Sequence, residues 1–245
     1  MKSQLKYTIS FYTNLQESKK SWLEINRAMR VVERAYKWAD KHLRKVVYPI
    51  VCNYPNNYKK NNLVIAVNID NENVGHSGGS FYPEDNEIVI NKYAEPICYT
   101  GVKLDVLNLL KDKKRLRHII VHELIHYAFT EYKYTKERQE PTEWRVGLSP
   151  WENTDNPVDK SFDKKWGLDE WLDEVLTETL ARYITGWPIK HTFQLYEKNI
   201  SDEHNDMLEK VKQRFVDGPV VIENIINALY YHDKSIFLDS KYYKF

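Results

Sequence analysis

Apolar residues in the first part of the chain recur at steps of three and four. Between residues 21 and 45 they are Trp22, Ile25, Met29, Val32, Tyr36, Ala39 and Leu43. This period predicts a helix with one apolar stripe that packs on the rest of the protein. Ser21 and Glu24 have the spacing of a capping box, so the helix is expected to begin there.

The next part of the chain has the pattern of short strands. Runs rich in β-branched residues occur at 46–52, 63–69 and 87–91, and Asn-rich turns or the Pro83-Glu84-Asp85-Asn86 segment separate them. These runs predict a small sheet. Gly78 and Gly79 precede an aromatic strand and indicate a bulge, a close approach of another backbone, or an ordinary loop into a hairpin.

The second half of the chain is mostly helical in pattern. A helical period covers 104–132, with a break near Lys111-Asp112, and a clearer one covers 168–184 and stops at Gly186. Further helices are expected near 202–216 and 220–231. The stretch 133–167 is irregular and contains Trp144, Trp151 and Trp166. These tryptophans either line or cap a substrate cleft, or anchor a long loop in the core.

Composition narrows the class of protein. The chain has 245 residues, of which 42% are hydrophobic, so it can bury a core. Lys and Arg number 36 against 35 Asp and Glu, a net charge of +1, which excludes binding to nucleic acid or membrane by bulk charge. The locally basic Lys111–Arg117 segment leaves nucleic acid open as a partner. The alternative interpretation of this segment is the solvated start of a helix. Oligomeric state is left open.

Cysteine content and targeting patterns add further limits. Cys52 and Cys98 are too few for a disulfide scaffold or a cysteine-based zinc module. The N-terminal residues lack the apolar core of a signal peptide, and runs such as Leu63–Val67 are too short to span a membrane. We therefore expect a cytoplasmic protein without membrane contact. Export by a route that needs no signal stays open.

The strongest chemical signal is His122-Glu123-x-x-His126. Residues four apart lie on one face of a helix, so the two imidazoles can bind one zinc ion while Glu123 reaches a water on that ion. The flanking residues are apolar nearly all round, which predicts a buried helix. His118 lies about 12 Å along the helix from His126, too far to share the ion, and is expected near the site or on the surface.

A catalytic zinc ion needs a third protein ligand. The 168–184 helix offers Glu170, Glu174 and Glu178 in one row. Periodicity alone leaves Glu174 and Glu178 open as ligands, and a solvated acidic stripe is the ordinary alternative for such a row.

Together these residues resemble the zincin metallopeptidases of the gluzincin type. Glu174, Thr177, Leu180 and Ala181 follow a pattern similar to that of small peptidases of the ImmA/IrrE kind, and the Glu174-x-x-x-Glu178 spacing also resembles the catalytic domain of anthrax lethal factor. The resemblance covers about residues 60–185. It implies zinc ligation by His122, His126 and Glu174, Glu123 as general base, and a small sheet whose edge strand binds substrate in extended form.

The expected fold class is therefore α+β, a zincin-like fold with a small mixed sheet packed on the two site helices. We expect one domain over 1–245, with an N-terminal helical region (1–45), a zincin core (46–185) and a C-terminal helical extension (186–245). The expected function is a zinc-dependent endopeptidase that cleaves a protein or peptide substrate through a metal-activated water. The alternative is a catalytically silent binding module for a protein or nucleic-acid partner.

Three features of the sequence bear on this assignment. A third histidine at the metzincin spacing is missing, since Tyr132 and Lys136 occupy those positions, and His191 and His204 lie in no matching motif. Tyr127, Tyr183 and His191 are candidates to stabilise the oxyanion. Glu178 is also a candidate to orient a ligand histidine.

Overall fold

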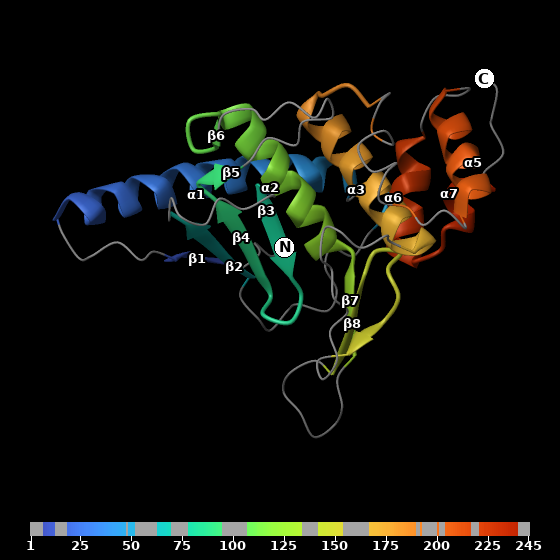
Figure 1. The fold of residues 1–245 in the computed structure, drawn as a ribbon, viewed down its shortest axis with the longest axis horizontal. Coiled ribbons are helices and arrows are strands. Elements are labelled where there is room, and N and C mark those ends of the chain that lie inside the picture. The colour runs from blue at the N-terminus through green and yellow to red at the C-terminus, as the bar shows by residue number, and fades with distance from the viewer. Residues whose placement is uncertain are drawn as a thin grey trace. The chain divides into compact units, whose positions relative to one another are not determined.

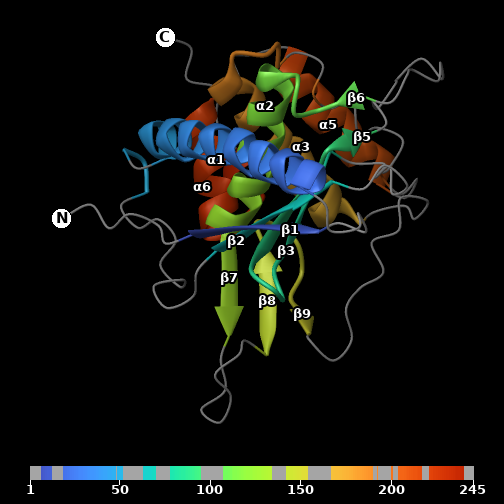
Figure 2. The same ribbon diagram turned by 90° about the vertical axis from the view of Figure 1, so that its left-hand side faces the viewer.

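The structure is a computed structural model. It describes residues 7–12, 19–47, 49–51, 63–69, 78–94, 107–133, 142–153, 167–189, 192, 200, 204–216 and 221–239. The chain divides into two compact units. The first comprises Met1–Arg44 with Tyr58–Tyr127, and the second comprises Lys45–Asn57 with Ala128–Phe245. Figure 1 labels most of the described elements, and Figure 2 also labels β9 (Glu152–Asn153).

The first unit contains a four-stranded mixed sheet in the order β1-β2-β4-β3. Strands β1 (Tyr7–Tyr12), β2 (Leu63–Asn68) and β4 (Glu87–Asn91) are parallel, and β3 (Gly79–Tyr82) runs antiparallel to β4. The central strand β2 is buried along most of its length because Leu63, Ile65 and Val67 are apolar. The small mixed sheet expected from the sequence is thus confirmed, and β1 is an addition.

Helix α1 (Lys19–Val47) packs beside this sheet (Figure 2). Its apolar stripe is buried, with Val32, Ala39 and Leu43 fully covered, as the period predicts. The predicted start is wrong. The helix begins two residues before Ser21. Glu24, the other residue of the predicted capping box, forms an ion pair with Lys92.

Two other details of the α1 region differ from the sequence prediction. Trp22, placed on the apolar stripe, is 56% exposed. The strand expected at 46–52 is also wrong where the structure describes it, because α1 continues to Val47. Val47 follows Leu43 by four residues, so it continues the buried helical stripe and is fully covered.

Helix α2 (Lys113–Ala128) begins after the predicted break. The Asp112 side chain accepts hydrogen bonds from the backbone amides of Lys114 and Arg115, and so caps the helix. The helical prediction before the break is wrong. Leu107–Asn108 forms strand β6, paired antiparallel with β5 (Tyr93–Ala94).

The second unit places a small antiparallel sheet in the stretch expected to be irregular. Its strands are β7 (Thr130–Lys133), β8 (Glu143–Val146) and β9 (Glu152–Asn153). The helical prediction through residue 132 is therefore wrong at its end. Trp144 is 2% exposed and anchors this sheet in the core, whereas Trp151 lies under the Lys133 ammonium, 3.6 Å from the ring centroid. Trp166 lies outside the described residues.

Four helices of the described residues belong to the second unit. Helix α3 (Leu168–Thr185) ends where the sequence predicts, at Gly186 in the left-handed conformation. Helices α5 (Asn205–Val216) and α6 (Ile222–Tyr231) match the two predicted C-terminal helices, and α7 (Ser235–Leu238) was not predicted. Helices α3 and α6 pack on each other, and both contain fully buried apolar residues, such as Leu172 and Ile225.

Overall the described residues form a mixed α+β protein, as expected. None of the described helices is both long and apolar enough to cross a membrane. The division into one domain with terminal additions stays a prediction.

Candidate metal centre

The two motif histidines lie one turn apart on α2. The helix is apolar on several sides, and Ile120, Val121 and Leu124 have no exposed surface. Nε2 of His122 and Nε2 of His126 are 3.1 Å apart, with the rings at 70° to each other. Both ring nitrogens therefore face the same point beside the helix.

This separation fits a shared zinc ion. Two nitrogens bound to tetrahedral zinc at about 2.0–2.1 Å are about 3.3 Å apart. Imidazole nitrogen is also among the preferred donors of that metal. The pair of histidines therefore has both the chemistry and the spacing of two zinc ligands.

Glu123 lies between the histidines in sequence and close to the edge strand β3 in space. Its side chain is buried, at 7% exposed. A Cβ atom added to Gly79 of β3 would lie 3.3 Å from Cγ of Glu123 and 2.8 Å from Cγ2 of Ile119. Strand β3 therefore passes directly against α2, and a side chain at position 79 would collide with that helix. The sequence left open a close approach of another backbone, but the nearest atoms here belong to side chains, those of Ile119 and Glu123 on α2 and of Ile90 on β4.

Strand β3 is at the edge of its sheet. Among the described strands it pairs only with β4, in an antiparallel register from Gly79 opposite Ile90 to Tyr82 opposite Glu87. Phe81 of β3 packs edge-on against Tyr127 of α2 at 5.9 Å between ring centroids. The edge strand β3 thus packs directly on the motif helix α2 within the first unit.

The acidic row lies on α3 in the second unit. Glu178 is buried, and its Oε1 accepts a hydrogen bond from Nε of Arg182 at 2.6 Å. Glu174 is partly exposed. Among the described residues, one ligand atom each of His122, His126 and Glu174 lie within 4.8 Å of one another, the only such group that could hold a metal. Glu178 is absent from that group and forms an ion pair instead.

The other sequence candidates have different surroundings. His118 is 7% exposed and is not part of the three-residue group, so of its two expected positions the surface is excluded and a place near the site stays a prediction. Tyr127 is fully buried, whereas Tyr183 is 52% exposed. His191 lies outside the described residues.

Sequence reasoning missed the contacts that fix α3 just before Glu174. Asp173 is 2% exposed, and its Oδ1 accepts a hydrogen bond from the backbone amide of Leu148 at 2.8 Å. The preceding Gly147 adopts φ +48°, and a Cβ there would collide with the Asp173 carboxylate. The only sequence signal was a glycine in an irregular stretch, which named no partner.

His232 holds the other side of this glycine turn. Nδ1 donates a hydrogen bond to the carbonyl oxygen of Gly147, and Nε2 lies 3.4 Å from Oε2 of Glu131. Burial is the largest influence on this imidazole, and it lowers the pKa of His232 below the usual 6.5 despite the opposing hydrogen bond to Gly147. The side chain is therefore held in its neutral form near neutral pH.

This shift predicts a pH-dependent free energy of unfolding. Because the folded pKa lies below the unfolded pKa, the unfolded state binds the proton first as the pH falls. The contribution of His232 to the free energy of unfolding is complete above about pH 6.5 and declines as the pH falls toward the folded pKa.

In urea titrations between pH 7.5 and 5.5, His232→Asn should show a smaller loss of stability than the wild type. Asparagine tolerates the φ of +54° at this position. An unchanged pH slope in the variant would rule out this role.

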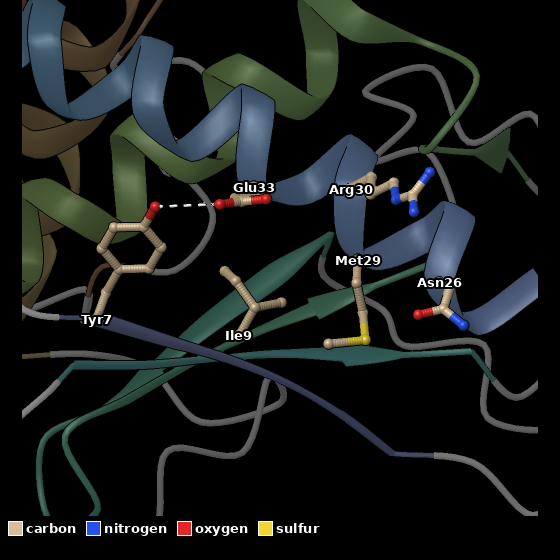
Figure 3. A pocket seen from close by; sticks show the side chains of 6 residues that line it. All are labelled: Tyr7, Ile9, Asn26, Met29, Arg30 and Glu33. Carbon is tan, nitrogen blue, oxygen red and sulfur yellow. Dashed lines mark hydrogen bonds between the residues drawn. The ribbon is translucent and has the colours of Figure 1, made fainter. Parts of the chain in front are cut away.

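A separate shallow groove lies between β1 and α1 in the first unit (Figure 3). Ile9 and Met29 line it, and the Tyr7 hydroxyl donates a hydrogen bond to Glu33 at 3.3 Å. It contains no group of potential metal ligands among the described residues. The groove is therefore distinct from the histidine pair in its chemistry.

The chain was compared with models of known protein families, with curated proteins and with solved structures. None of the three comparisons finds a match.

Proposed function

We propose that the protein is a zinc-dependent endopeptidase. His122, His126 and Glu174 hold the ion, and Glu123 is the general base. The observation that carries this proposal is the geometry of α2, where two imidazole nitrogens 3.1 Å apart face one point and a buried glutamate follows the first of them. That arrangement of donors and base suits hydrolysis of an unreactive amide bond.

The proposed chemistry divides between the ion and the protein. Bound zinc would supply Lewis acidity, which lowers the pKa of water and polarises a carbonyl group. The Glu123 carboxylate removes a proton from the attacking water and later delivers it to the nitrogen of the leaving amine. The Glu123 carboxylate is buried and so largely shielded from bulk water.

Strand β3 supports a peptide as the substrate. An extended chain can add to the free edge of a sheet through backbone hydrogen bonds. Because Gly79 brings β3 within contact distance of Glu123, a peptide on that edge would pass near the general base. This proximity favours cleavage within a chain over cleavage of small molecules.

The test combines metal analysis with cleavage profiling. We expect purified protein to contain about one zinc ion per chain, and to cleave a proteome-derived peptide pool at internal bonds detected by mass spectrometry. Removal of zinc by a chelator should abolish cleavage, and added zinc should restore it. Bound zinc with no cleavage of the pool would instead favour the catalytically silent binding module. Cleavage that survives complete removal of metal would overturn the proposal.

A matched pair of variants tests the choice of third ligand. Glu174→Gln should weaken zinc binding by more than about 100-fold, since it replaces a charged ligand, and outer-shell changes alone typically cost about 10–100-fold. Glu178→Gln, four residues later on the same helix, should weaken zinc binding much less, because Glu178 pairs with Arg182. Competition with a fluorescent zinc chelator measures both affinities. The reverse order of effects would assign the ligand to Glu178.

A further inference from the structure

The charge of the chain is unevenly distributed. Helix α1 contains nine Lys and Arg residues against three Asp and Glu, a net charge of +6. The whole chain has a net charge of only +1, so the remainder sums to −5. A near-neutral protein thus carries one strongly basic helix.

Five of the positive charges of α1 lie on one solvent-exposed face. Between Ile25 and Arg44, the exposed residues are Asn26 and five cations, which we call the basic row: Arg27, Arg30, Arg34, Lys37 and Lys41. They follow each other at steps of three or four, so they form one stripe opposite the buried residues. From Arg27 to Lys41 the stripe is roughly 21 Å long.

Most of the basic row has no ion-pair partner among the residues that the structure describes. Lys37 pairs with Glu33 at 2.8 Å. In the described part of the chain, Arg27, Arg30, Arg34 and Lys41 make no ion pair with any acidic group. A solvated helix face ordinarily mixes both signs of charge, because interspersed charges limit self-repulsion. A row of four such cations is therefore available to an external polyanion.

The start of α2 extends this surface. The Arg117 guanidinium lies over the ring of Trp38 from α1, 4.7 Å from its centroid, and Trp38 stacks on His42. Lys113 and Lys114, one turn earlier on α2, are exposed. The basic segment singled out in the sequence thus adjoins the basic row through the Arg117–Trp38 contact.

We propose that the basic row binds the phosphate backbone of double-stranded DNA. The exposed side of a helix is a convex ridge, and the major groove of DNA is wide enough to admit an α-helix between two lines of phosphates. Arginine supplies three of the five cations, and its guanidinium binds phosphate in a bidentate manner. The apolar side of α1 is buried in the core, so the helix has no apolar face that could insert into a membrane beside its cations.

This inference does not depend on the peptidase proposal. Contacts to phosphates carry no sequence information, so the binding is expected to be independent of sequence and strongly dependent on salt. Glu123→Gln should bind DNA as the wild type does, because Glu123 is buried and not part of the row.

The experiment measures fluorescence anisotropy of a labelled 24-base-pair DNA of mixed sequence at several salt concentrations. Four phosphate contacts predict an affinity loss of about 150-fold between 50 and 200 mM salt. One such contact remains in the triple variant Arg27→Gln/Arg30→Gln/Arg34→Gln. The DNA affinity of this variant should therefore fall only about threefold over the same range of salt. The variant should also bind more weakly than the wild type at 50 mM salt.

A matched control removes the same amount of charge elsewhere. Lys133→Gln/Lys210→Gln/Lys212→Gln should keep the wild-type salt slope, because these lysines lie on other elements. Circular dichroism verifies that both triple variants remain folded, and Arg27→Lys/Arg30→Lys/Arg34→Lys should retain most of the binding. Equal losses in the two Gln variants would overturn the proposal. So would failure to bind DNA at 50 mM salt, or preferential binding to phosphatidylserine-containing vesicles that requires the same arginines.

Discussion

Glu123→Gln is expected to lower the rate of peptide hydrolysis by about 10²–10⁴-fold while zinc content stays unchanged. Glutamine has the shape of glutamate but cannot accept the proton of the attacking water. Glu123 is also outside the group of three potential ligands, so the change leaves the metal donors intact. The measurement pairs initial rates on a cleavable peptide with zinc content determined by mass spectrometry.

The control for this variant is Glu209→Gln. Glu209 lies on α5 with its side chain 70% exposed and pairs with Lys212, so the same chemical change there should leave the rate unaltered. Full activity in Glu123→Gln would refute the assignment of Glu123 as general base. If the variant lost zinc together with its activity, the result would instead indicate that Glu123 is needed for metal binding.

Gly147→Ala is expected to lower the free energy of unfolding by about 3 kcal/mol. The left-handed conformation costs a residue with a Cβ about 1–2 kcal/mol. The added methyl group would also collide with the Asp173 carboxylate, and overpacking of this kind costs about 1–3 kcal/mol. For a chain of this length the melting temperature should fall by about 6–12 °C, measured by thermal unfolding.

Gly186→Ala separates the two contributions. Gly186 also has a positive φ, of 69°, but a Cβ there would meet no atom within 4 Å. It should therefore show only the conformational cost of about 1–2 kcal/mol. Equal destabilisation of the two variants would mean that the contact with Asp173 contributes nothing. A stable Gly147→Ala would contradict both the conformation and the contact.

The elements that sequence predicted well have strong local signals. The long period of α1 and the left-handed stop at Gly186 after α3 depend on residues close in the chain, so their side chains reveal them. The failures have the opposite cause. Leu107–Asn108 lies in a helix-like pattern but forms a strand because it pairs with Tyr93–Ala94, a partner that local periodicity cannot reveal.

The candidate site divides in the same way. The sequence by itself determined that His122 and His126 share a helix face, because a spacing of four residues fixes this in any α-helix. It could not choose between Glu174 and Glu178, since both lie on one row of one helix. It also could not show that β3 passes against Glu123 at Gly79, or that Asp173 holds the turn at Gly147.

Those features were decided only by the tertiary structure. Contacts such as Asp173 with Leu148 join residues far apart in the chain, and their existence depends on how whole elements pack. The same holds for the basic row. The sequence determined its charges and their helical spacing, but only the burial of the opposite face of α1 determined that all five cations are exposed to solvent together.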